Sequence, residues 1–209
     1  MTVDEPLRRC DWVGAATDYL DYHDQEWGVP THGERALFER ISLEAFQSGL
    51  SWITVLRKRP AFRAAFADFE PAAVADFGPD DVDQLLTDTG IIRNRAKIAA
   101  CIGNARATLQ LPMPLDELLW RFAPAGPRRR PRTAAEVPAA TDASRALADT
   151  LKGYGFRFVG PTTAYALMQA TGMVDDHLAG CWRAVAADSR AAVPAPPEIS
   201  SVGPSADFC

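Results

Sequence analysis

One carboxylate and one indole lie close together at a predicted helix corner. Glu44 stands inside the apolar run ISLEAF, and Trp52 follows Gly49 in the first turn of the next predicted helix. An indole offers a ring face and a carboxylate offers two acceptor oxygens, so the pair could bind a flat, polar-edged, cationic ligand. The alternative is a solvated Glu44 and a Trp52 that only packs in the core.

A second group of residues has types and spacing suited to a metal ion. His177 and Cys181 are four residues apart, which on a helix places both side chains on one face. Cys10 and His23 could supply the other two ligands of a tetrahedral zinc site. A zinc ion with four protein ligands is structural, because no coordination position stays open for catalysis. In a reducing compartment the alternative for the four cysteines of this chain is free thiols.

A third candidate site lies between two predicted helices. The first helix ends at Gly153, the turn GYGFRFVG follows, and Pro161 opens the second helix. In a helix-hairpin-helix arrangement, backbone N–H groups of the turn and of the next helix face a DNA phosphate. Gly160 would be the second glycine of such a hairpin, and Thr162 lies just after it. An ordinary corner between two helices is the alternative.

The net charge of −5 by itself argues against a nucleic-acid partner, but the charges are unevenly distributed. Residues 91–160 contain 12 Lys and Arg against 5 Asp and Glu. They include Arg93, Arg95 and the run RRRPR. Phosphate binding requires only a local basic face, so DNA remains a candidate partner. A solvated loop is the alternative for RRRPR.

The elements that must position these residues are predicted to be helices. Helical periodicity and capping residues predict helices at 34–48, 51–59 (bounded by Pro60), 69–77, 80–86, 94–109, 115–122 and 142–152, and another that starts at Pro161. Residues 9–28 are predicted to be loop and short helix, and residues 123–140 a surface loop. Since no convincing period-two strand occurs, the predicted fold class is all-α.

Length and composition indicate one globular domain. The chain has 209 residues and 47% hydrophobic content. We expect the domain to cover residues 1–183, with the hairpin at about 153–161, and the Ala- and Pro-rich residues 184–209 to form a disordered tail. The first residues lack an apolar segment, and no run is long enough to span a bilayer. We therefore expect a cytoplasmic monomer without a membrane partner.

Several longer motifs identify a family. The stretches RCDWV, YHDQEWGVP, LFERISLEAFQSGLSWITVLRKR, GIIRNRAKI, IGNARA, FVGPTTAYALMQATG and DDHLAGC together resemble the bacterial 3-methyladenine DNA glycosylase I family. The resemblance runs from about Cys10 to Trp182. It implies a helix-hairpin-helix fold, one structural Zn²⁺ that joins the terminal segments, and excision of 3-methyladenine from alkylated double-stranded DNA.

The resemblance also assigns roles to individual residues. It implies that Cys10, His23, His177 and Cys181 bind zinc and that Trp12, Tyr22, Glu44 and Trp52 form the base pocket. For DNA contact we select Gly49, Leu50, Arg93, Arg95, Gly160 and Thr162, with Leu50 as the wedge that fills the space of a flipped base. Glu44 and Asp175 are the candidate catalytic residues.

Four positions depart from the family pattern. Ala45 and Ser48 replace the usual Gly and Ala, which predicts a narrower or more polar pocket floor. Phe158 stands in place of the first hairpin glycine. Asp175 replaces Asn, and it either acts in catalysis or caps the segment and supports His177. Two other functions remain open: a DNA-damage recognition module without catalysis, and a glycosylase for another cationic adduct.

Overall fold

The computed structural model describes residues 7–126 and 129–184. Those residues form helices and connecting loops without a β-strand, which confirms the all-α prediction. The expected disordered tail at 184–209 lies outside the described residues except for Ala184. Among the described helices, none is long and apolar enough to cross a membrane.

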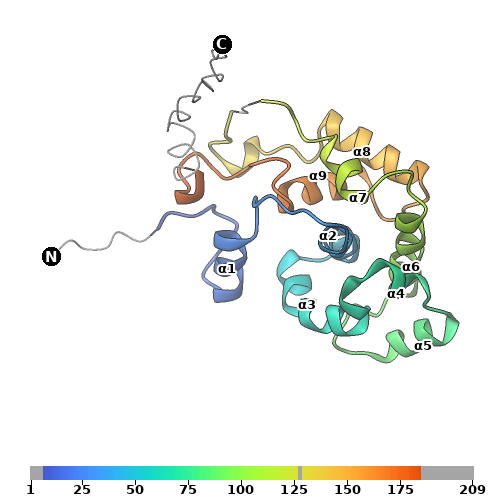
Figure 1. The fold of residues 1–209 in the computed structure, drawn as a ribbon. Helices are drawn as coiled ribbons and strands as arrows, with labels where there is room; N and C mark the ends of the chain where they lie inside the picture. The colour runs from blue at the N-terminus through green and yellow to red at the C-terminus, as the bar shows by residue number, and fades with distance from the viewer. Residues whose placement is uncertain (1–6, 127–128, 185–209) are drawn as a thin grey trace, which may run out of the picture.

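The helices follow the chain in the order shown in Figure 1. The α-helices are α1 (Thr17–Gln25), α2 (Glu34–Gln47), α3 (Trp52–Ala65), α4 (Pro71–Ala75), α5 (Pro79–Thr87), α6 (Arg95–Leu109), α7 (Leu115–Trp120), α8 (Asp142–Gly153) and α9 (Pro161–Ala170). Two 3₁₀ turns, η1 (Ala67–Phe69) and η2 (Ala134–Glu136), lie in the connections.

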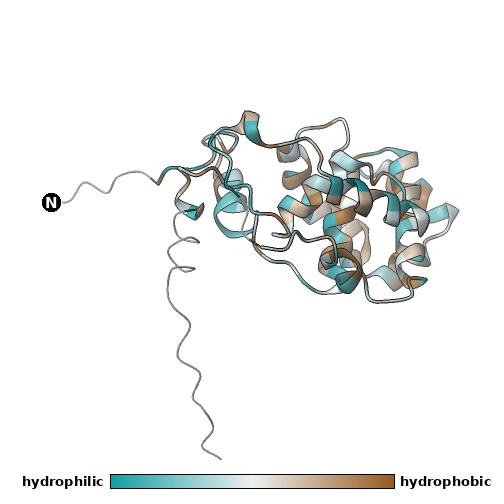
Figure 2. Cartoon of the chain, turned by 90° about the horizontal axis from the view of Figure 1, so that it is seen from above, coloured by the Kyte–Doolittle hydropathy of each residue, from teal (hydrophilic) through white to brown (hydrophobic). Residues whose placement is uncertain are grey.

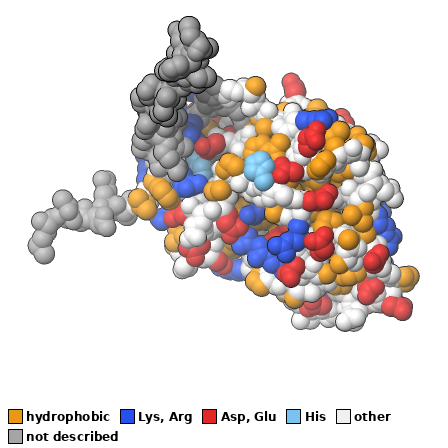
Figure 3. Space-filling model, in the orientation of Figure 1, with side chains coloured by type: hydrophobic (Ala, Val, Ile, Leu, Met, Phe, Trp, Pro, Cys, Tyr) orange, Lys and Arg blue, Asp and Glu red, His pale blue; other side chains and the backbone are white. Residues whose placement is uncertain are grey.

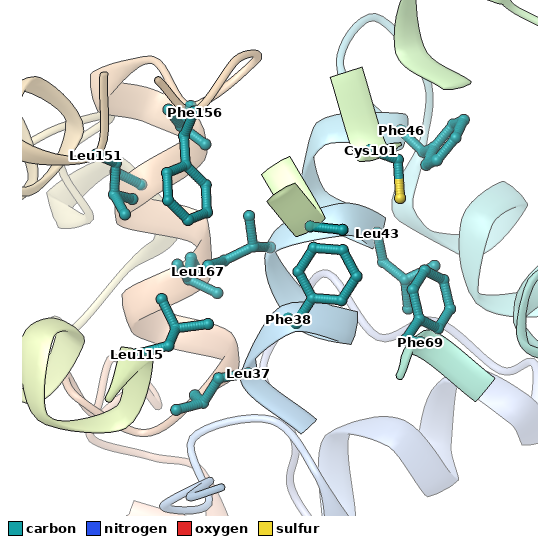
Figure 4. Packing of buried hydrophobic residues seen from close by; sticks show 14 of the residues in the cluster. Leu37, Phe38, Leu43, Phe46, Phe69, Cys101, Leu115, Leu151, Phe156 and Leu167 are labelled. Atoms are coloured by element: carbon teal, nitrogen blue, oxygen red, sulfur yellow. The ribbon is translucent and has the colours of Figure 1, made fainter. Parts of the chain in front are cut away.

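Helix α2 is the central element of the fold. It contacts α3, α4, α6, α7 and α9, and the side chains of residues 37, 38 and 41–46 are all buried. In Figure 4, Phe38 and Leu43 of α2 lie between Leu167 of α9 on one side and Phe69 on the other. Because the helix is buried on all sides from residue 41 to residue 46, Glu44 is buried with it.

Local sequence explains where several helices begin. The Thr141 hydroxyl accepts a hydrogen bond from the Ser144 N–H, and the Asn94 side chain accepts one from the Lys97 N–H. Pro71 and Pro161 occupy the first turns of α4 and α9, where the missing N–H has no consequence. Helix α3 differs from the prediction because it continues through Pro60 to Ala65.

Packing explains why Pro60 does not end α3. Phe62 and Phe66 follow it, are fully buried, and pack against Phe46 with ring centroids 4.6 and 5.7 Å apart. Burial of two aromatic rings offsets the roughly 3 kcal/mol that an internal proline costs a helix. A short sequence window around Pro60 does not include Phe46, against which Phe62 and Phe66 pack.

The two ends of the described chain lie side by side (Figure 1). A small apolar cluster separate from the main core contains Cys10, Val13, Leu178, Cys181 and Ala184. In Figure 2 this end of the molecule lies apart from the larger group of helices, in which hydrophobic and hydrophilic stretches alternate. The segment around Cys10 is therefore held against the segment 178–184 through this cluster.

Candidate active site and metal centre

A pocket of about 350 Å³ opens between α1, α2, α3 and α9. It is lined by Trp12, Tyr19, Tyr22, Trp27, Glu44, Gln47, Trp52, Ala134, Val137, Ala166, Gln169, Asp176 and Leu178. All four residues assigned to the base pocket are in this set. The volume falls in the usual range for small-molecule sites, and the lining combines aromatic rings with a few polar groups.

Glu44 is a buried acidic group of the pocket. The residue is 5% exposed, and burial raises its pKa from 4.5 to about 8, although the positive charge of Arg40 acts in the opposite direction. Burial removes the hydration of this carboxyl group, and the charge of Arg40 offsets only part of that loss. The carboxyl group is therefore poised to bind a ligand that carries hydrogen-bond donors or positive charge.

Aromatic rings form the walls of the pocket. The rings of Tyr22 and Trp52 are 5.3 Å apart and tilted by 45°, and Trp12 packs edge-on against Tyr22 at 6.4 Å. The Trp52 Nε1 atom is buried and has no hydrogen-bond partner within the described part of the chain. A buried donor without a partner costs free energy, which a ligand with an acceptor would recover. Burial also raises the pKa of Tyr22, so this phenol stays neutral.

Sequence reasoning missed an amide and a carboxylate at the far wall. Asp176 is buried, and its Oδ2 accepts hydrogen bonds from the Tyr165 hydroxyl at 2.5 Å and from Gln169 Nε2 at 2.9 Å. Both Gln169 and Asp176 line the pocket. Gln169 is on α9 and Asp176 lies in the loop after that helix, so no helical spacing in the sequence indicated this pair.

Asp175 lies outside the pocket lining. One oxygen forms an ion pair with Arg130 Nη1 at 2.6 Å, and the other accepts a hydrogen bond from the backbone N–H of His177 at 3.1 Å. The structure thus places Asp175 beside a metal-site residue and away from Glu44. This arrangement favours the supporting role over the catalytic one.

The four candidate metal ligands meet in one place. Ligand atoms of Cys10, His23, His177 and Cys181 all lie within 4.8 Å of one another, and all four residues are buried. The Cys181 Sγ is 3.4 Å from His23 Nε2 and 3.7 Å from His177 Nδ1. The segment 177–181 is a turn rather than the helix that the spacing implied, and the Cys181 N–H bonds to the Leu178 carbonyl at 2.7 Å.

Hydrogen bonds outside the cluster orient both imidazole rings. His177 Nε2 lies 3.2 Å from the Trp27 carbonyl oxygen, and His23 Nδ1 lies 2.8 Å from Asp24 Oδ1. Each ring thus uses its outer N–H as a donor and turns a lone pair toward the sulfur atoms. Metal-binding histidines in proteins have this arrangement, so the residues fit a metal ion.

Asp24 connects the cluster to Arg9 and Trp182, which lie near the two ends of the described chain. Arg9 and Trp182 donate hydrogen bonds to its carboxylate, as His23 does. Burial opposes ionisation, but these donors lower the pKa of Asp24 to about 2. The carboxylate that orients His23 therefore stays charged across the physiological range.

The two sulfur atoms have opposite pKa shifts. A hydrogen bond with Cys181 and burial raise the pKa of Cys10, whereas the same hydrogen bond lowers the pKa of Cys181. The Leu178 N–H also donates to Cys10 Sγ at 3.4 Å. The cluster therefore favours at least one thiolate, and two sulfurs with two imidazoles make a donor set that suits zinc.

The candidate hairpin lies between α8 and α9. Gly160 is the N-cap of α9, and Thr162 is exposed in its first turn. Phe158 adopts φ +58°, the left-handed conformation that glycine takes most easily. The departure from the family pattern thus leaves the backbone conformation in place, at a cost of roughly 1–2 kcal/mol for a residue with a Cβ atom.

The corner between α2 and α3 presents the candidate wedge. Gly49 adopts φ +80°, and Leu50 beside it is 42% exposed. The Lys97 ammonium group donates to the carbonyl oxygens of Phe46 at 2.8 Å and Ser48 at 2.6 Å, which fixes the end of α2. Neither Ala45 nor Ser48 lines the pocket, so these two departures leave its lining unchanged.

The two selected arginines differ in their surroundings. Both Arg93 and Arg95 are exposed, but Arg95 forms an ion pair with Asp83 at 2.6 Å. Figure 3 shows Lys and Arg side chains interspersed with Asp and Glu on the face turned toward the viewer, and within residues 91–160 Arg121 and Arg145 also pair with acidic side chains. The basic charge of residues 91–160 is therefore partly offset by neighbouring acidic side chains.

The chain is similar to known DNA glycosylases in sequence. A family model for methyladenine glycosylase matches residues 12–184. DNA-3-methyladenine glycosylase 1 of Escherichia coli (strain K12) is 49% identical over 179 residues, which cover 84% of this chain and 96% of that protein.

Solved structures agree with this match. A crystal structure of 3-methyladenine DNA glycosylase I superimposes with a TM-score of 0.81 and 48% identity, covering 84% of this chain and 98% of the other. A variant of 3-methyladenine DNA glycosylase I in complex with 3-methyladenine has a TM-score of 0.78 and 34% identity, covering 83% and 95%.

Proposed function

The chain belongs to the methyladenine glycosylase family, and we propose how its pocket performs the reaction of a DNA-3-methyladenine glycosylase, the hydrolytic release of 3-methyladenine from alkylated DNA. The observation that carries this function is the buried Glu44 in an aromatic pocket whose Trp52 Nε1 lacks a partner. A flat cation with polar edges satisfies each of these groups.

Charge recognition selects the substrate. A 3-methylated adenine in DNA is cationic, so its glycosidic bond is already weakened and the leaving base needs no protonation. The rings of Trp12, Tyr22 and Trp52 offer faces to the cation, and Glu44 accepts hydrogen bonds from its donor edge. Neutral adenine gains less from both interactions, which gives selectivity for the lesion.

The reaction breaks the bond between the base and C1′. Its electron pair goes to the base, which leaves as neutral 3-methyladenine, while a water molecule adds to C1′ and releases a proton. Loss of the positive charge weakens the interaction with Glu44 and favours product release. Asp175 acts by holding the segment of His177, as its hydrogen bond to the backbone N–H supports.

Access to the base requires flipping it from a DNA duplex, which costs a few kcal/mol. Leu50, exposed at the corner beside Gly49, fills the vacated space. The N–H groups at Gly160 and Thr162 bind a phosphate, and Arg93 and Arg95 add electrostatic attraction. The domain that performs this work covers residues 1–183, and the protein acts as a monomer in the cytoplasm.

A zinc ion held by Cys10, His23, His177 and Cys181 has a structural role. When bound, it cross-links the segment before α1 to the segment after α9. This link positions Trp12, which lies two residues from Cys10 and forms part of the pocket wall.

Incubation with methylated duplex DNA, followed by chromatography of the released bases, tests the function. We expect 3-methyladenine, with no base released from unmethylated DNA. Release of a different methylated base instead would identify a glycosylase for another cationic adduct, and binding without release would identify a recognition module. Single-turnover measurements then separate the two possible roles of Glu44.

In the charge-recognition mechanism, Glu44→Gln weakens lesion binding by about 1–3 kcal/mol. If Glu44 instead were the general base, the chemical step would fall about 10²–10⁴-fold while lesion binding stayed unchanged. Trp52→Ala is the comparison variant. It removes the indole ring and should reduce the affinity for the lesion whichever role Glu44 has.

A further inference from the structure

An arginine lies behind the pocket, next to the residue that carries its charge. Arg40 is on α2, one helical turn before Glu44, and its side chain is only 12% exposed. Its guanidinium carbon lies 5.8 Å from the centre of the Tyr22 ring. Arg40 therefore contacts one pocket residue and shares a helix face with another.

The carboxylate that binds Arg40 is shared with a second arginine. Arg40 Nη2 lies 2.8 Å from Glu26 Oε2, and Arg59 binds both oxygens of the same group, at 2.5 and 2.7 Å. One negative charge thus faces two positive charges, and one positive charge remains in excess. Arg40 Nη1 is buried and has no hydrogen-bond partner within the described part of the chain.

Other charged or titratable groups around Glu44 lie on α1, α3, α6 and α9 and in the loops that follow α1 and α9. They are Tyr19 and Tyr22 on α1, Glu26 just after α1, Arg59 on α3, Lys97 on α6 at the end of α2, and Asp176 with Tyr165 across the pocket. Lys97 is bound to the carbonyl groups of Phe46 and Ser48, and Arg59 is bound to Glu26. Arg40 is the cation whose field lowers the pKa of Glu44 against the effect of burial.

We propose that Arg40 is a positioning residue that favours the ionised form of Glu44 in the base pocket and so extends excision to lower pH. Glu26 binds the Arg40 guanidinium beside α1, and Glu26→Gln would keep an acceptor oxygen for it while removing the negative charge. The effect on excision rests on the proposed role of Glu44, whereas the effect on the ionisation of Glu44 does not.

Carbon-13 NMR of protein labelled at glutamate carboxyl groups measures this ionisation directly, with Glu44→Gln used to assign the signal. In Arg40→Met we expect the pKa of Glu44 to rise by about one unit, the lower end of the effect of a nearby opposite charge. Arg40→Lys should restore most of the shift. In Glu26→Gln, the unneutralised arginines should lower the pKa of Glu44, the opposite direction.

Excision of 3-methyladenine measured against pH gives the functional readout. Arg40→Met should lower the rate about tenfold near pH 7, corresponding to one pKa unit, and the rate should approach that of the unmodified protein at high pH. Arg63→Met is the matched control, because Arg63 is an exposed arginine of α3 bound to Glu39. Its pH profile should not move.

The outcomes separate the two claims. An unchanged Glu44 pKa in Arg40→Met and in Glu26→Gln would overturn the proposal, as would a rate that falls equally at every pH. A shifted pKa with an unshifted excision profile would uphold the effect of Arg40 on Glu44 and overturn the proposed role of Glu44. Should Arg40→Met not fold, Glu26→Gln provides both readings, because the pKa of Glu44 and the pH profile of excision should then both move to lower pH.

Discussion

Asn104 holds the backbone of Arg157 with both polar atoms of its side chain. Its Oδ1 accepts a hydrogen bond from the Arg157 N–H at 2.8 Å, and its Nδ2 donates to the Arg157 carbonyl oxygen at 3.1 Å. The next residue is Phe158, with φ +58°. A fully buried amide on α6 thus stabilises the strained turn between α8 and α9.

Asn104→Ala should disturb this hairpin specifically. It removes two hydrogen bonds and leaves two partly buried backbone groups of Arg157 without these partners, which should lower the free energy of unfolding by about 1–3 kcal/mol. Binding to undamaged duplex should weaken, whereas binding of free 3-methyladenine, measured by calorimetry, should stay unchanged. Equal loss in both measurements would argue against a separate hairpin contact.

Cys181→Ser should release the metal and destabilise the fold. Elemental analysis should find one zinc per chain in the original protein and much less in the variant, with a loss of several kcal/mol in stability because metal binding is linked to folding. Cys101→Ser is the matched control, since Cys101 is buried on α6 away from the cluster and should keep the metal. Metal-free original protein of full stability would contradict the prediction.

Glu44→Gln should stabilise the protein more as the pH rises. The folded-state pKa of Glu44 is about 8 against an ordinary value of 4.5, so between these values the folded state binds a proton that the unfolded state has lost. Stability contributed by this group therefore falls as the pH rises from 4.5 to 8, by a few kcal/mol in total. Thermal unfolding of both proteins should show that the stability advantage of Glu44→Gln over the original protein is larger at pH 8 than at pH 5.

Leu50→Ala should slow excision from duplex DNA while leaving the pocket intact. A smaller side chain fills less of the space of a flipped base, so the flipped state becomes less populated. Excision from single-stranded DNA should change less. Leu109→Ala, at an exposed leucine 54% accessible at the end of α6, provides the control and should match the original protein.

Arg93→Ala should weaken binding to undamaged duplex more than Arg95→Ala does. Asp83 already offsets the charge of Arg95, whereas no ion pair of Arg93 is recorded among the described residues. The slope of log affinity against log salt should fall by roughly one for each phosphate contact that is lost. Equal slopes for both variants would show that the Asp83 pair opens on DNA.

The sequence determined the all-α fold, most helix positions, the Cys and His cluster and four residues of the pocket. Apolar periodicity placed α2 and α6, and capping residues such as Thr141 placed helix starts, because these signals depend on neighbours within one or two turns. Long motifs assigned Glu44 and Trp52 to the base pocket and Cys10 and His177 to the metal site, although spacing alone gave the wrong local structure for the segment 177–181.

Tertiary structure decided the features that depend on contacts between residues far apart in the sequence. The continuation of α3 past Pro60 follows from rings that pack from α2, and the separation of Asp175 from Asp176 follows from which carboxylate faces Tyr165 and which faces Arg130. The charge of Glu44 depends likewise on Arg40, whose partner Glu26 is 14 residues away on another element. Burial and electrostatic fields arise only when such segments meet in space, so no local pattern in the sequence encodes them.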